Sequence, residues 1–122
     1  MIYQVEINNK NFIVHFEDTG SQERFIADSL LTSYARNKNC IIFVFDITDR
    51  KSFDEIKNKY NPLKVKSNSQ NNIYILVGNK SDLKYQRTVS YEEVDFLADK
   101  HKMKYILYQI LMVKYQRVHN LK

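Results

Sequence analysis

Three polar side chains directly follow one of the most apolar stretches of the sequence. Residues 73–77 read Ile-Tyr-Ile-Leu-Val, and Asn79, Lys80 and Asp82 come after a single glycine. A short apolar run bounded by turn formers favours a buried parallel strand, and ligands of parallel sheets bind beyond the carboxyl ends of the strands. An amide, a long-stemmed cation and a carboxylate that can accept two parallel N–H bonds suit a flat heterocycle with adjacent donors. Guanine has these donors and adenine lacks them, so the cluster predicts discrimination between purines.

A second polar segment follows another predicted strand. Residues 18–25 read Asp-Thr-Gly-Ser-Gln-Glu-Arg-Phe. A carboxylate at a strand end can hold Mg²⁺ through water, and an amide side chain can orient an attacking water. Each segment also has a simpler interpretation. The first could be a solvated turn after a strand, and the second a polar loop that leads into a helix.

Both segments resemble motifs of the Ras superfamily of small GTPases, most closely its Rab branch. Asn79, Lys80 and Asp82 match the guanine-specificity motif of that family. The resemblance implies that Asp82 holds the base edge, that Lys80 lies along the ring face, and that Asn79 ties this loop to the phosphate-binding loop. It also implies that Asp18 holds Mg²⁺ through water and that Gln22 positions the water that attacks GTP.

The second motif departs from the family pattern at two neighbouring positions. The Rab-type second switch reads Asp-Thr-Ala-Gly-Gln-Glu-Arg-Phe, so Gly20 stands in place of an alanine. Ser21 stands in place of the glycine whose backbone N–H meets the γ-phosphate. If the loop needs a glycine's conformational freedom there, Ser21 is expected to impair switching. By resemblance, Phe25 and the helix after it are expected to contact regulator or effector proteins.

Strands are predicted from apolar runs and from alternation of apolar and polar residues. Residues 2–7 and 12–16 alternate on either side of an Asn-rich segment and predict a β-hairpin. Residues 40–45 form a second buried strand, and residues 105–108 form the last one. Cys40, with its apolar neighbours, is expected to be a small core residue.

Helices are predicted where apolar residues recur at helical spacing, beginning near residues 26, 52 and 90. Pro62 is expected to kink or end the second helix, unless it restarts a short segment. Two of the predicted helix starts carry capping boxes, formed by Ser52 with Glu55 and by Ser90 with Glu93.

The predicted fold class is α/β, a partial Ras-like domain of the P-loop NTPase type. It has three layers and a mixed sheet, in which an N-terminal β-hairpin is followed by parallel strands alternating with helices. Residues 1–108 are expected to form the partial GTPase domain and residues 109–122 a divergent tail. No Gly-x-x-x-x-Gly-Lys-Ser/Thr occurs in the sequence, which has only two glycines. The resemblance therefore implies an N-terminal truncation and a gap in the sheet beside residues 40–46.

Bulk properties narrow the function classes. The 27% of charged residues and 43% of hydrophobic residues are typical of a globular domain, and the net charge of +5 favours acidic partners without choosing among them. The basic run at residues 100–104 lacks interleaved aromatics, so no nucleic-acid partner is expected. Without a signal peptide, a transmembrane segment or a prenylation motif, the sequence predicts a cytoplasmic protein that carries no lipid anchor.

Two hypotheses of function follow. The first is a Rab- or Ras-like guanine-nucleotide switch in vesicle traffic or signalling, with GTP or GDP and Mg²⁺ as ligands. Because phosphoryl transfer needs a phosphate-binding loop, this chain is not expected to hydrolyse GTP by itself. The alternative is a non-catalytic pseudo-GTPase fragment that acts as a protein-interaction module, whose partner binding would be indifferent to nucleotide.

Overall fold

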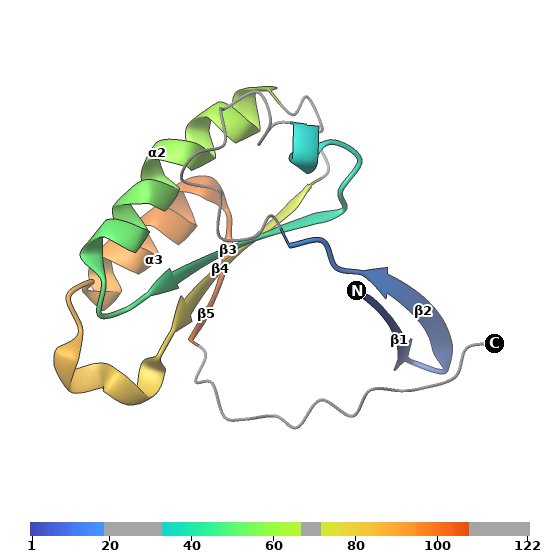
Figure 1. The fold of residues 1–122 in the computed structure, drawn as a ribbon, viewed down its shortest axis with the longest axis horizontal. Coiled ribbons are helices and arrows are strands. Elements are labelled where there is room, and N and C mark those ends of the chain that lie inside the picture. Colours follow the sequence, from blue (N-terminus) through green and yellow to red (C-terminus); the bar gives the residue numbers. More distant parts are fainter. Residues whose placement is uncertain (19–32, 67–71, 108–122) are drawn as a thin grey trace.

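The computed structural model describes residues 1–18, 33–66 and 72–107, with the backbone alone for residues 59–66. The described strands form two sheets. An antiparallel pair consists of β1 (Ile2–Ile7) and β2 (Lys10–His15). A parallel sheet has the order β3 (Cys40–Asp46), β4 (Ile73–Asn79) and β5 (Lys104–Leu107). Two helices and a 3-10 helix connect its strands: α2 (Arg50–Lys66), η1 (Ser81–Gln86) and α3 (Tyr91–His101) (Figure 1).

The predicted β-hairpin is confirmed, with a turn shorter than its Asn-rich segment suggested. Lys10 already pairs with Ile7 in the ladder. The two turn residues, Asn8 and Asn9, have φ angles of 51° and 59°. Two successive residues in the left-handed region give the type I′ geometry that matches strand twist, and asparagine tolerates this region better than most residues.

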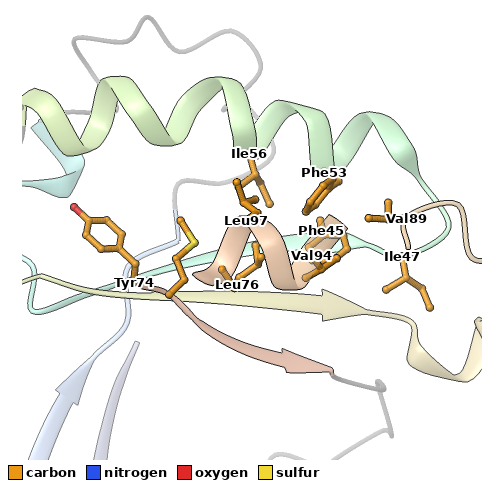
Figure 2. Close-up of a cluster of buried hydrophobic side chains, with 11 residues drawn as sticks. Phe45, Ile47, Phe53, Ile56, Tyr74, Leu76, Val89, Val94 and Leu97 are labelled. Atoms are coloured by element: carbon orange, nitrogen blue, oxygen red, sulfur yellow. The ribbon is translucent and has the colours of Figure 1, made fainter. Parts of the chain in front are cut away.

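The hydrophobic core lies between the parallel sheet and its two helices. Alternate residues of a strand face the same side, so Phe45 of β3 and Leu76 of β4 point together towards Phe53 of α2 and Val94 of α3 (Figure 2). All four side chains are almost fully buried. Both helices cover this one face (Figure 1), so the described residues show one helical layer of the two that the prediction placed around the sheet.

The opposite face of the parallel sheet is exposed in the described part of the chain. Its apolar side chains include Ile42 and Val44 of β3 and Ile106 of β5, with exposed fractions of 45%, 58% and 48%. Cys40 lies at the start of β3, on the same side as Ile42, and is also exposed. The prediction that Cys40 is a core residue is therefore wrong, because its apolar neighbours indicated a strand but not which side of it is covered.

The start of α2 differs from the prediction. The helix begins at Arg50, and the Asp49 side chain accepts a hydrogen bond from the Lys51 backbone N–H at 3.0 Å. Ser52 is therefore inside the helix, where its hydroxyl donates to the Asp49 carbonyl at 2.7 Å. The capping box predicted for Ser52 and Glu55 is wrong, because an earlier carboxylate already caps the helix.

The remaining predictions on helices have mixed outcomes. The capping box of Ser90 and Glu93 is confirmed at the start of α3. Pro62 does not end α2, which continues to Lys66. A proline removes only one backbone donor, and the hydrogen bonds on either side of it remain available.

No helix in the described ranges is long and apolar enough to cross a membrane. The tail predicted over residues 109–122 lies outside the described residues.

Candidate functional site

Parallel pairing brings the carboxyl ends of β3 and β4 to one edge of the sheet. Asp46, the last residue of β3, lies opposite Asn79, the last residue of β4. The Ile47 N–H donates to the Asn79 carbonyl at 3.2 Å, which extends the pairing by one step. Lys80 and Asp82 follow directly. The structure thus places the three residues of the first predicted motif beyond the end of a buried parallel strand, where such sheets bind ligands.

Gly78 lets the end of β4 pack closely against its neighbours, just before this edge of the sheet. A Cβ atom at this position would lie 3.1 Å from the Tyr105 hydroxyl oxygen and 3.2 Å from side-chain carbons of Phe45 and Ile47. Real Cβ atoms rarely approach other atoms so closely, because packed interiors leave little room to give way. The absence of a side chain at Gly78 therefore fixes how near β4 lies to its neighbours, and with it the position of Asn79.

Lys80 has an unusual backbone conformation for a residue with a side chain. Its φ and ψ angles of 64° and 39° lie in the left-handed region, directly before η1. The Asn79 side-chain oxygen accepts the Lys80 N–H at 2.8 Å, and the Lys80 carbonyl accepts the Leu83 N–H at 2.9 Å. A left-handed residue costs about 1–2 kcal/mol when it is not glycine. Such conformations cluster at functional sites, where the surroundings hold them in place.

The side chain of Lys80 forms an ion pair with Asp46. Its Nζ lies 2.5 Å from Asp46 Oδ2, and the exposed fractions of the two side chains are 47% and 21%. The other carboxylate oxygen, Oδ1, accepts the Thr48 N–H at 2.8 Å and the Thr48 hydroxyl at 2.7 Å. The carboxylate of Asp46 is thus engaged on both oxygens.

These contacts shift both ionisation equilibria towards the charged forms. Burial raises the pKa of Asp46, but the hydrogen bonds from Lys80 and Thr48 outweigh it and hold that pKa below the usual value. The hydrogen bond to Asp46 raises the pKa of Lys80, and the negative charge of Asp82 acts in the same direction. Both members of the pair are therefore charged at neutral pH.

Asp82 differs from Asp46 because its carboxylate has no partner among the described residues. It lies exposed in the first turn of η1 and forms no hydrogen bond or ion pair with another described residue. Both of its oxygens are available to a pair of parallel N–H donors. With the alkyl stem of Lys80 nearby, the residues present fit the edge of a guanine base. The given sequence contains no Gly-x-x-x-x-Gly-Lys-Ser/Thr motif, the glycine-rich loop that cradles phosphates.

The second predicted motif falls mostly outside the described residues. Gly20, Ser21, Gln22 and Phe25 are not described, and of the helix after them residues 33–35 are helical. Asp18 is described and exposed, shortly after β2. Within the described ranges, no three side chains of His, Cys, Asp or Glu gather into a group that could hold a metal ion. The Mg²⁺ site therefore stays a prediction.

Asp46 and Thr48 were missed by sequence reasoning. The available signal was that two predicted buried strands each end in a polar residue, Asp46 and Asn79. Neighbouring parallel strands bring such ends together. What the pattern does not contain is the register of the two strands, which decides that the carboxylate faces Lys80.

Comparison with known proteins shows which family the chain is similar to. A family model described as the Ras family matches residues 1–110. GTP-binding protein ypt2 of Schizosaccharomyces pombe is 36% identical over 106 residues, which cover 86% of this chain and 51% of that protein. Ras-related protein Rab-13 of Rattus norvegicus is 37% identical over 105 residues, or 85% of this chain and 50% of that protein. The chain spans about half the length of the curated relatives it matches.

Proposed function

We propose that this chain, which belongs to the Ras family, recognises the guanine base of GTP or GDP through Asn79, Lys80 and Asp82 as part of a guanine-nucleotide switch. The observation that carries the proposal is the exposed carboxylate of Asp82, which pairs with no other described residue and lies beyond the carboxyl end of β4, beside a lysine whose amine is paired. A carboxylate in this state is ready to accept the two adjacent N–H donors of guanine.

Each residue has a distinct role in the proposed recognition. Asp82 accepts the two donors on the base edge, and the alkyl stem of Lys80 lies along the ring face. Asn79 holds the turn through the hydrogen bond from the Lys80 N–H. Adenine would leave Asp82 desolvated without a donor pair, and an unpaired buried charge is costly enough to give strong discrimination.

The other steps of the switch are assigned by resemblance to Rab-type proteins. In the whole protein, Gln22 would position the attacking water, Asp18 would hold Mg²⁺ through water, and the segment around Phe25 would contact regulators or effectors. Bound Mg²⁺ would neutralise the phosphate charge during phosphoryl transfer. The pathway proposed is vesicle traffic or signalling in the cytoplasm. Since the chain has no phosphate cradle, we expect it to bind the base weakly and not to hydrolyse GTP alone.

Protein-observed NMR tests the proposal, because it detects weak binding. The ¹⁵N-labelled chain is titrated with GDP and, separately, with ADP, in the presence of Mg²⁺. We expect GDP to shift the backbone amide signals of residues 79–82, and ADP to shift them much less. Asp82→Ala should abolish the GDP-induced shifts. Asp95→Ala is the matched control, because it removes an exposed aspartate on α3 and should bind GDP as the wild type does.

Two results would contradict the proposal. Equal shifts with GDP and ADP would show that the site does not read the base. No shift with either nucleotide, from a chain whose spectrum shows that it is folded, would favour the pseudo-GTPase alternative.

A further inference from the structure

Asp46 connects two segments that meet at the candidate site. Its carboxylate accepts two hydrogen bonds from Thr48, in the loop after β3, and binds the amine of Lys80, in the loop after β4. Its backbone N–H also donates to the Ser52 hydroxyl in the first turn of α2, at 3.0 Å. With its side chain held by Thr48 and its backbone held by Ser52, Asp46 is a rigid anchor for a flexible partner.

Lysine is such a partner. Its four-carbon stem has many rotamers, and much of this conformational freedom is lost when the side chain is fixed. Fixing the amine of Lys80 on Asp46 imposes that loss before any ligand arrives. A ligand that contacts the stem then does not have to order it, and such preorganisation increases affinity.

We propose that Asp46 is a positioning residue for guanine recognition, which fixes the amine of Lys80 so that the stem of this lysine is ordered before the base binds. The inference rests on the proposed function, since it assigns a further residue to the same site. Asp46 itself touches no nucleotide in this account and acts through Lys80. The pair therefore assists binding and does not compete with it.

The test combines three variants of the full chain. Asp46→Asn keeps an oxygen that can accept from Thr48 but removes the charge that holds Lys80. Lys80→Met keeps an unbranched stem but cannot form the pair. Asp54→Asn is the matched control, because Asp54 also pairs with a lysine, Lys57 on α2, at 2.8 Å. The readouts are GDP affinity from NMR titration and the pKa of the Lys80 amine from NMR of its side chain.

We expect Asp46→Asn to weaken GDP binding by about tenfold, in line with the loss of a charge-assisted contact that orders the site. The pKa of Lys80 should fall towards its ordinary value, because its largest stabilising contact is gone. Asp54→Asn should change neither quantity. In the Lys80→Met background, Asp46→Asn should have little further effect, which is the signature of a residue that acts through another.

Other outcomes would overturn the inference. Unchanged or tighter GDP binding by Asp46→Asn would show that the pair is irrelevant to the base or competes with it. Equal losses in the wild-type and Lys80→Met backgrounds would show that Asp46 acts by a route other than Lys80. If the wild type itself binds no GDP, the proposed function fails and this inference fails with it. Loss of GDP affinity by Asp82→Ala but not by Asp46→Asn leaves the proposed function standing and overturns the inference alone.

Discussion

Lys80 has an unfavourable backbone conformation, although its side chain is paired. Its φ of 64° is in the left-handed region, while its amine is paired with Asp46 and its N–H with the side chain of Asn79. The sequence motif predicted that Lys80 follows a buried strand and belongs to a binding site. It could not predict the ion pair, because the partner belongs to a different strand and the pairing depends on the register of β3 against β4.

Two substitutions at Lys80 isolate the contribution of its backbone conformation to stability. Lys80→Gly and Lys80→Ala both remove the pair with Asp46, but only glycine adopts a positive φ without strain. The glycine variant should therefore have the higher free energy of unfolding, by about 1 kcal/mol, even though glycine is the more flexible residue in the unfolded chain. Urea denaturation followed by circular dichroism measures the difference. An alanine variant that is equally or more stable would show that the left-handed conformation is not maintained.

Single elements were predicted well where the signal is local and poorly where it depends on a distant partner. The hairpin and the capping box of Ser90 and Glu93 rest on alternation and on residue spacing, and both are confirmed. The start of α2 was placed too late because two polar residues, Asp49 and Ser52, both suit a helix N-terminus. Only the structure shows that the hydroxyl of Ser52 is turned back to the end of β3.

Gly78 gives a prediction at the scale of the strand. A methyl group at this position would press on Phe45, Ile47 and Tyr105 at 3.1–3.2 Å, so Gly78→Ala should destabilise the chain by about 1–3 kcal/mol through overpacking. It should also shift the amide signals of Asn79 and Lys80, since β4 must move. Thermal unfolding and ¹⁵N NMR measure the two effects. The control is Val77→Ala, whose half-buried side chain lies on the opposite side of β4. If Gly78→Ala is as stable as the wild type, the close approach does not constrain the site.

At the scale of the whole molecule, the described helices α2 and α3 cover only one face of the parallel sheet. The hairpin forms a sheet of its own, in agreement with the predicted gap beside β3. One face of β3, β4 and β5 is packed against α2 and α3, and the other carries exposed Ile42, Val44 and Ile106 (Figure 1). The family match and the element order agree on an α/β, Ras-like chain. Hydrophobic runs predicted these strands because buried parallel strands are apolar on both faces, but such runs do not reveal which face is covered.

The four residues proposed to form the base-recognition site, Asn79, Lys80, Asp82 and Asp46, all lie within the described residues, at the ends of β3 and β4 or in the segment after β4. Base reading should therefore be measurable without the phosphate contacts. The 2-amino group of guanine is one of the two donors that Asp82 is proposed to accept. Inosine diphosphate lacks this group and is otherwise the same ligand, so the comparison of the two isolates a single hydrogen bond to a charged acceptor.

The most direct test is therefore an NMR titration of the wild-type chain and of Asp82→Ala with GDP and with inosine diphosphate. We expect the wild type to bind GDP about tenfold more tightly than inosine diphosphate, the size of one charge-assisted hydrogen bond. Asp82→Ala should lose this preference, with no detectable shifts from either nucleotide. Equal affinity of the wild type for both nucleotides, or a preference for GDP that persists in Asp82→Ala, would contradict the assignment of Asp82 as the residue that reads guanine.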